Sequence, residues 1–331
     1  MVNSAVVDKP DIDGAQSERA PRFSLLERAG IGIVTILGVL PITLRSAAGW
    51  ALGYIVGCVP FRDQRVARAQ VSTFLEANRP DVVVRRSFAN AGATLCESLH
   101  LQPILRSHEK RITCSSWPKI EEWTAADRPI VALTGHTANW DLLAAYMIHR
   151  GIPLTTIGRE ARNPAGQHIL AKMRQGYGIE TIWRSDRRAV KRLMECLKQR
   201  RVVAALIDQD TRVDSRFVPF FGFPAKTPSS LISLGIRARA RFVSAFLFRV
   251  GFMRYEVFAE EFPDNLSEDE ILTMYNARLE ALVRRFPGQW VWFHKRWRSR
   301  PDGTVLSTRR YLASMSQNAF DRNSVETNKS S

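Results

Sequence analysis

The hydrophobic pattern of the chain changes character near residue 62. Before it, residues 29–44 and 46–61 form two uncharged runs of 16 residues each, separated by Arg45. Each run is shorter than the roughly 20 residues of an upright membrane-spanning helix. Joined through Arg45, the two runs predict a tilted span, a helical hairpin in one leaflet, or a helix that lies in the membrane interface. A buried hairpin in a soluble core is the alternative.

Basic residues flank this apolar segment. Arg28 precedes it, and Arg62, Arg65 and Arg68 follow it, a distribution that favours anionic headgroups on the cytoplasmic side of a membrane. We therefore predict a membrane-attachment segment over residues 23–62. The polar stretches 1–22 and 313–331 are predicted to be flexible tails, and the acidic first stretch lacks the basic start of a signal peptide.

From residue 128 onward, short apolar runs alternate with amphipathic stretches, which predicts an α/β layer with largely parallel strands. The runs that predict buried strands are Ile130–Thr134, Leu154–Ile157, Ile179–Trp183, Val202–Ile207, Phe242–Val250 and Tyr255–Ala259. The helical stretches are Trp140–His149, Pro164–Gln175, Ala189–Gln199, Ser229–Arg239 and Ser267–Phe286. Ser267 and Glu270 have the spacing of a capping box at the start of the last helix. With no internal repeat, residues 63–312 are predicted to form one domain.

Charge narrows the class of partner. The 331 residues carry 48 Lys and Arg against 32 Asp and Glu, a formal charge of +16, which favours nucleic acid, anionic lipid headgroups or a phosphorylated substrate. No nucleic-acid reader motif or alternation of aromatic and basic residues is present, so nucleic acid is not the expected partner. The four cysteines have no metal-ligand spacing, and we expect them to be reduced and buried.

The local motif with the clearest chemistry is Gly135–Asp141, directly after the first predicted strand. His136 and Asp141 are five residues apart, roughly 140° out of line on a continuous helix. If His136 lies in the turn and Asn139 caps the helix, Asp141 falls in the first helical turn and can fold back to orient the imidazole. Such a pair can act as a general base on a substrate hydroxyl without a protein nucleophile. The alternative is purely structural, with His136 ending the strand and Asp141 capping the helix.

Several short sequence motifs, in their order along the chain, resemble those of one protein family. The segment His136-Thr-Ala-Asn-Trp-Asp141 resembles the HX4D/E motif of the lysophospholipid acyltransferase-like superfamily, and is closer to the lipid A lauroyl/myristoyl acyltransferases. The other blocks that resemble this family are Arg159 with Asn163-Pro164, Asp208-Gln-Asp210 with Phe217–Gly222 and Ala225–Pro228, Pro287–Trp292 with His294, Arg296 and Trp297, and Glu97 before the first strand. The resemblance covers about residues 25–300. It implies a single glycerolipid-acyltransferase-like domain, with a parallel or mixed sheet flanked by helices.

The resemblance implies an O-acyltransferase attached to the inner membrane, with its catalytic domain facing the cytoplasm. The donor would be acyl carrier protein or acyl-CoA, and the acceptor a hydroxyl of a phosphorylated lipid A precursor. His136 would be the base, Asp141 would orient it, and Arg159 would serve the oxyanion or bind an acceptor phosphate. Residues expected to contact substrate are Asn139, Trp140, Asn163, Asp208, Asp210, Phe217 and Phe220. No cofactor and no metal is expected.

Some residues depart from the family pattern. Asp141 replaces the usual Glu of the family, Ala138 replaces the usual Gly, and Gly158-Arg-Glu160 replaces the usual Tyr-Arg-Pro. These departures bear on the identity of the acceptor more than on the type of reaction. Another glycolipid or a lysophospholipid is therefore an alternative acceptor. A metal-dependent glycosyltransferase that uses Asp208 and Asp210 is the alternative from another class, and a catalytically silent membrane scaffold is a third.

Overall fold

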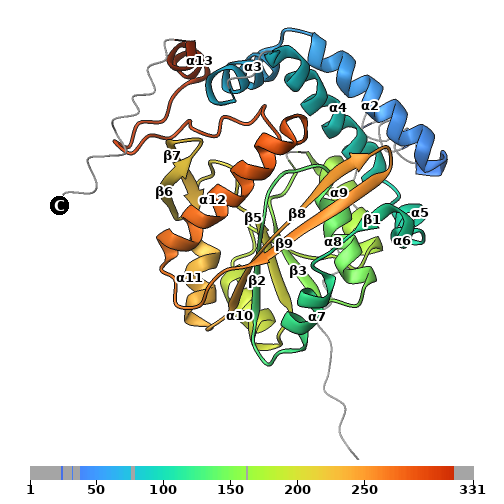
Figure 1. Ribbon diagram of the computed structural model, residues 1–331, viewed down its shortest axis with the longest axis vertical. Coiled ribbons are helices and arrows are strands. Elements are labelled where there is room, and N and C mark those ends of the chain that lie inside the picture. The colour runs from blue at the N-terminus through green and yellow to red at the C-terminus, as the bar shows by residue number, and fades with distance from the viewer. Residues whose placement is uncertain (1–23, 25–31, 33–37, 76–78, 162, 317–331) are drawn as a thin grey trace, which may run out of the picture.

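A seven-stranded sheet lies at the centre of the molecule (Figure 1). The structure is a computed structural model and describes residues 24, 32, 38–75, 79–161 and 163–316. The strand order is β1-β9-β8-β2-β5-β3-β4. Strands β8, β2, β5, β3 and β4 run parallel, whereas β9 pairs with β8 in an antiparallel hairpin. The strands are β1 (Ile112–Thr113), β2 (Ile130–Thr134), β3 (Leu154–Gly158), β4 (Glu180–Trp183), β5 (Val202–Leu206), β8 (Arg241–Gly251) and β9 (Arg254–Glu261). The sheet is therefore mixed, with a parallel centre.

The central strands are continuous apolar runs because both faces of the sheet are covered. Alternate residues of a strand point to opposite faces. In β2, Val131 and Leu133 join one hydrophobic core, while Ile130 and Ala132 join the other. Burial on both sides explains why these strands show no polar alternation.

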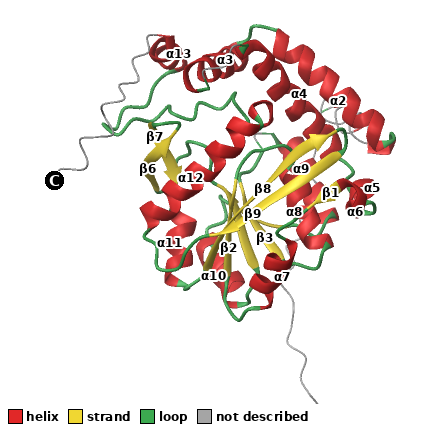
Figure 2. Cartoon of the chain, in the orientation of Figure 1, coloured by secondary structure: helices red, strands yellow, loops and turns green. Residues whose placement is uncertain are grey.

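Helices cover both faces (Figure 2). The first core includes side chains of α10 (Ala189–Lys198), α11 (Ser230–Arg237) and α12 (Glu268–Arg285). The second includes side chains of α7 (Trp117–Ala125) and α8 (Trp140–His149). The remaining elements are α3 (Arg62–Phe74), α4 (Pro80–Ser98), α5 (Gln102–Leu105), α6 (His108–Arg111), α9 (Pro164–Gly176), η1 (Pro287–Gln289), α13 (Thr308–Ser316) and the hairpin β6 (Ser215–Phe220) with β7 (Phe223–Pro228).

Helix α2 (Ile42–Cys58) lies along α4 with its small residues inward (Figure 1). Gly49, Gly53 and Gly57 are buried against α4, and a Cβ at Gly53 would lie 2.2 Å from the Phe88 carbonyl oxygen. Only glycine lets the two backbones approach so closely, as in the small-residue contacts between membrane helices. Most of the large apolar side chains of α2 consequently point away from the protein.

Arg45, the one charge inside the apolar segment, is buried in this contact. Its guanidinium donates to the carbonyl oxygens of Gly38 at 2.6 Å and His100 at 2.7 Å. The outer face of α2 therefore carries no charge from Arg45. Among the described residues, no single helix is long and apolar enough to cross a bilayer, while α2 and α3, bent by 83°, pass that test of length and composition as a pair.

The predicted strands and helices of the α/β layer are confirmed to within one or two residues at their ends, and Trp140–His149 has the predicted bounds. The capping box of Ser267 and Glu270 is also confirmed. The β6–β7 hairpin was not predicted, because its aromatic residues have no strand-like alternation. The predicted boundary at residue 312 is too early, since α13 continues to Ser316 and Met315 is buried. Residues 1–22 and 317–331, predicted as tails, lie outside the described residues.

Candidate active site

His136 lies in the turn between β2 and α8, at the carboxyl end of the parallel strands. Strand β5 is the neighbour of β2, and its end brings Asp208 to the same edge of the sheet. Nδ1 of His136 lies 2.7 Å from Oδ1 of Asp208, and the backbone N–H of His136 donates to Oδ2 at 2.8 Å. The carboxylate thus places the ring proton on Nδ1. It leaves Nε2, which has no hydrogen bond within the described residues, free to act as a base.

A third donor completes the surroundings of Asp208. The indole N–H of Trp290 donates to Oδ2 at 2.8 Å. Burial of Asp208 raises its pKa, but the charge on His136 and the hydrogen bonds from His136 and Trp290 outweigh burial and lower the pKa to about 2. The carboxylate is therefore ionised at neutral pH and stabilises an imidazolium on His136. Gly135 makes room for this arrangement, since a Cβ there would lie 3.3 Å from the Asp208 carboxylate.

The predicted contact between Asp141 and His136 is wrong. Asp141 lies in the first turn of α8, as predicted, but its carboxylate accepts from Nε of Arg174 at 3.1 Å. The reason is geometric: His136 precedes the helix and its ring turns toward the end of β5, whereas Asp141 faces α9. A part for Asp141 in the chemistry stays a prediction.

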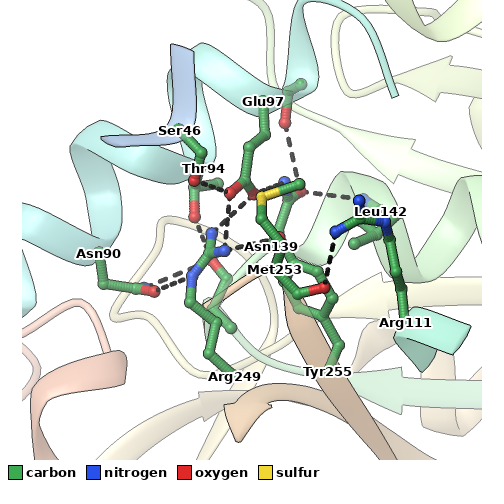
Figure 3. Close-up of polar contacts among 12 residues, drawn as sticks. Ser46, Asn90, Thr94, Glu97, Arg111, Asn139, Leu142, Arg249, Met253 and Tyr255 are labelled. Carbon is green, nitrogen blue, oxygen red and sulfur yellow. Dashed lines mark hydrogen bonds and ion pairs between the residues drawn. The ribbon is translucent and has the colours of Figure 1, made fainter. Parts of the chain in front are cut away.

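The start of α8 is held by a buried charge network (Figure 3). Asn139 caps the helix, because its Oδ1 accepts from the N–H of Leu142 at 2.9 Å, and its amide donates to Glu97 at 3.1 Å. Both oxygens of Glu97 accept from Arg249, each at 2.7 Å, and Ser46 of α2 donates to the same carboxylate at 2.5 Å. Burial raises the pKa of Glu97, but Arg249, Ser46 and Asn139 lower it overall.

The network connects three distant parts of the chain. Ser46 comes from α2, Glu97 from α4 and Arg249 from the end of β8. The side chain of Asn139 is buried and binds Leu142, Glu97 and Ser98, and its predicted contact with substrate stays a prediction. Ala138 before it has φ of +37°, a left-handed conformation that explains why glycine is the usual residue here.

Other predicted site residues separate into those that line the site and those that do not. Trp140 packs edge-to-face on His136, with ring centroids 5.0 Å apart. Asn163 is the N-cap of α9, its Oδ1 accepting from Gly166 at 2.6 Å. Phe220 is buried among Trp290 and Trp297 in the core, and its contact with substrate stays a prediction.

Phe217 and Asp210 also differ from expectation. Phe217 lies on the β6–β7 hairpin, partly exposed, and lines neither of the two concavities described next. The carboxylate of Asp210 accepts from the backbone N–H of Ser299 at 2.7 Å and from its hydroxyl at 3.1 Å. Asp210 therefore fixes the closing segment of the domain. Because Asp208 and Asp210 turn to different partners, their carboxylates do not converge.

Two concavities of opposite chemistry are lined by residues that follow His136 and Asp208 in the chain. One is an apolar cavity between a sheet face and the helices α7, α8 and α9, with Trp140, Asp141 and Arg174 among its lining residues. The other is an open basic cleft of about 940 Å³. Its charged lining residues are Arg62, Asp63, Arg159, Arg184, Asp210, Arg212, Lys295 and Arg298. Arg159 thus lies where the resemblance implied, within a group of cations.

Sequence reasoning missed the hydrogen bonds that Asp208 accepts from His136 and Trp290. A signal was present for Asp208: it directly follows a buried strand, and carboxyl ends of parallel strands meet at one edge of a sheet. The strand order that makes β2 and β5 neighbours is not readable from the sequence. Trp290 belongs to one of the blocks that resemble the family, but nothing in that block shows that it contacts Asp208.

We expect the low pKa of Asp208 to make stability depend on acid pH. Its folded-state pKa of about 2 is below its ordinary value of 3.8, so its contribution is present above pH 4 and is lost as the pH falls toward 2. The loss is about 2 kcal/mol. Urea unfolding from pH 6 to pH 2 should show a steeper decline for the wild type than for Asp208→Asn. Parallel curves would contradict the assignment.

The chain is similar to known proteins of one family. The family description "Bacterial lipid A biosynthesis acyltransferase" matches residues 15–299. A lipid A biosynthesis acyltransferase of Haemophilus influenzae is 24% identical over 290 residues, which are 84% of this chain and 89% of that protein. Among solved structures, the 1-acyl-sn-glycerophosphate acyltransferase of Thermotoga maritima matches with a TM-score of 0.34 and 12% identity, over 68% of this chain and 95% of that one.

The match to the family description spans most of the chain, and its HX4D segment is the turn that carries His136. The protein therefore belongs to the bacterial lipid A biosynthesis acyltransferase family and is an acyltransferase.

Proposed function

We propose that the protein transfers a fatty acyl chain from acyl carrier protein, or from acyl-CoA, to a hydroxyl of a phosphorylated lipid A precursor. The observation that carries the proposal is the His136–Asp208 pair at the carboxyl edge of the sheet. Trp140, which packs on His136, lines the apolar cavity, and Asp210, two residues after Asp208, lines the basic cleft. An acyl thioester is apolar at one end, while a lipid A precursor carries phosphates. The relative from Haemophilus influenzae is named for lipid A biosynthesis.

In this mechanism Nε2 of His136 removes the proton of the acceptor hydroxyl as its oxygen attacks the thioester carbonyl. A C–O bond forms, the C–S bond then breaks, and the thiolate leaves with the proton that His136 returns. Asp208 holds the ring and stabilises its positive charge through the 2.7 Å contact with Nδ1. General-base assistance of this kind contributes roughly 10²–10⁴-fold to the rate.

The apolar cavity is the proposed site of the acyl chain. Its sheet side is built by residues of β2, β3, β5, β8 and β9 that alternate toward one face, and small side chains leave the space. These small residues are Ala132, Ala204, Ala245 and Ala259. Asp141 and Arg174 form an ion pair in the same lining, beside the Trp140 ring that packs on His136. A chain bound there would place its carbonyl near the catalytic base.

The basic cleft is the proposed site of the phosphorylated group. Arg159 and Arg184 line it together with Arg212 and Arg298, and guanidinium groups form bidentate contacts with phosphate oxygens. This neighbourhood supports phosphate binding by Arg159, in preference to a role at the oxyanion. Exposed cations of α10 and its flanks, including Arg187, Arg188 and Lys191, would suit an acidic carrier protein.

We further propose that the protein is attached to the inner membrane through α2, with its catalytic domain on the cytoplasmic side. Leu44, Leu52 and Ile55 are each at least 60% exposed on the outer face of α2. Phe252, at the tip of the β8–β9 hairpin, is 65% exposed and lines a groove together with Trp50 of α2. Apolar side chains gathered in this way match insertion into the headgroup region of a leaflet.

The function is tested by acyl transfer with purified protein. Donors are acyl carrier protein and CoA thioesters with saturated chains of several lengths, and the acceptor is a phosphorylated lipid A precursor. Transfer should fall roughly 10²–10⁴-fold in His136→Ala and in Asp208→Asn, because the base or its orientation is lost. Asp269→Asn, an exposed carboxylate on α12, is the control and should keep full activity.

Absence of transfer by the wild type from any donor would remove the lipid A precursor as acceptor. Lysophospholipids and other glycolipids, offered with the same donors, would then identify the acceptor class. Full transfer by His136→Ala would overturn the assignment of the base.

Filling the cavity should shorten the preferred acyl chain. Ala204→Leu adds three carbon atoms to the lining, and the excess volume should lower activity with the longest accepted donor by roughly 10–200-fold, while shorter donors are little affected. Ala204→Ser adds almost no volume and is the matched control. Equal losses for all chain lengths, or an unchanged profile with an intact fold, would place the acyl chain elsewhere.

Membrane attachment is tested by flotation with vesicles that contain anionic phospholipid. Ile55→Glu should reduce the bound fraction about tenfold or more, because burial of one large aliphatic side chain is worth about 1.5–3 kcal/mol. Phe252→Glu should reduce it too. Val190→Glu on α10 is the matched control, since Val190 and Ile55 are both 61% exposed. Equal losses in all three variants, or no loss in any, would contradict the assigned surface.

A further inference from the structure

The tripeptide Asp208-Gln209-Asp210 binds two imidazole rings, one through a nitrogen that donates a hydrogen bond and the other through a nitrogen that accepts one. The carboxylate of Asp208 takes the Nδ1 side of His136, which leaves Nε2 as an acceptor. Two residues on, the backbone N–H of Asp210 donates to Nε2 of His294 at 3.1 Å. An imidazole nitrogen that accepts a hydrogen bond carries no proton, so neutral His294 carries its proton on Nδ1.

His294 is held rigidly in this tautomer. The side-chain amide of Gln70 donates to the His294 carbonyl oxygen at 2.9 Å, and Oε1 of Gln70 accepts from the N–H of Arg296 at 3.1 Å. Gln70 thereby clamps the backbone on both sides of the ring. The ring is therefore fixed by the N–H of Asp210, in the loop after β5, and the backbone on both sides of it by Gln70 of α3.

His294 is also kept neutral. Burial lowers its pKa, the positive charge of His136 lowers it further, and the pKa falls to about 4. At neutral pH the ring therefore offers an N–H without a positive charge. The two rings are held by residues of the same tripeptide, His136 by Asp208 and His294 by Asp210. His294 lines the basic cleft, and its Nδ1 has no hydrogen-bond partner in the part of the chain that the structure describes.

From this geometry we infer that the Nδ1–H of His294 is an oxyanion donor of the acyl transfer. The inference rests on the proposed function. As the acceptor oxygen bonds to the thioester carbon, the C=O electron pair moves onto the carbonyl oxygen, and His294 donates a hydrogen bond to that oxygen while keeping its own proton. When the C–S bond breaks, the pair returns to the carbonyl. His136 alone gains and returns the transferred proton.

A neutral, fixed donor suits this task better than Arg159. Arg159 is exposed, and its neighbours in the cleft are further cations, an environment for bound phosphate. Donors that are oriented in advance stabilise developing negative charge without reorganising during the reaction. His294 meets that condition because both its ring and its backbone are tied to the protein. Its neutrality also avoids a second positive charge beside the imidazolium that forms on His136.

Two substitutions separate the donor from the structural contact. In His294→Gln, the amide can reach the position of Nε2 and accept from Asp210, but no donor remains at the position of Nδ1. In His294→Asn, the shorter amide N–H lies near the position of Nδ1, whereas the N–H of Asp210 loses its acceptor. The Gln variant should lose roughly 10²–10³-fold in kcat, with KM for the donor little changed. The Asn variant should keep more of the kcat despite a lower thermal stability.

Hydrolysis of the acyl thioester by water provides a readout that needs no glycolipid acceptor. If the wild type acylates no lipid A precursor but its thioester hydrolysis falls in His294→Gln, the proposed acceptor is wrong and the inference stands. Unchanged kcat in His294→Gln, or the same loss in both variants, would overturn it.

The tautomer is measured without any activity. Nitrogen-15 NMR of the histidine side chains of the full-length protein should show His294 with a proton on Nδ1 and none on Nε2 at pH 7. The signals that disappear in His294→Gln belong to His294, and those that disappear in His136→Ala belong to His136. A proton on Nε2 of His294 would overturn the inference.

Discussion

The carboxylate of Asp208 is the interaction on which the site depends. It is fully buried at the edge of the sheet, and it accepts from the backbone and ring of His136 and from the indole of Trp290. An ionised carboxylate can be buried only when such donors compensate for lost water. The same bonds that make its burial tolerable fix the ring of His136 and join β5, the β2–α8 turn and the closing segment.

A second buried charge pair connects this edge to the amino-terminal helices. Glu97 and Arg249 form two hydrogen bonds in the interior, and Ser46 and Asn139 satisfy the remaining capacity of the carboxylate. Removing one partner would leave an uncompensated charge, which is costly in a protein interior. The contact therefore couples the position of α2, whose apolar face is exposed, to the cap of the helix that follows His136. The surface proposed to meet the membrane and the catalytic turn share one rigid frame.

The apolar cavity and the basic cleft differ because their walls have different origins. The apolar cavity is walled by alternate residues of sheet strands, where alanines leave room between larger side chains. The basic cleft is walled by loops and helix ends that follow β3, β4 and β5, where cations can remain hydrated. Residues at a single carboxyl edge of the sheet thus line both an apolar cavity and a basic cleft.

The sequence by itself determined the α/β layer, because continuous apolar runs and 3.6-residue periodicity depend on local pattern and burial. It also identified the turn with His136, the capping role of Asn139 and the apolar segment before residue 62. It did not determine which carboxylate orients His136. Asp141 is near in sequence, yet it pairs with Arg174, whereas Asp208 is 72 residues away and makes the contact. The order β2-β5 and the direction of each side chain decide that pairing. The strand order and the side-chain directions follow from tertiary packing, because the burial of both sheet faces and the pairing of buried charges depend on residues that are distant in the sequence.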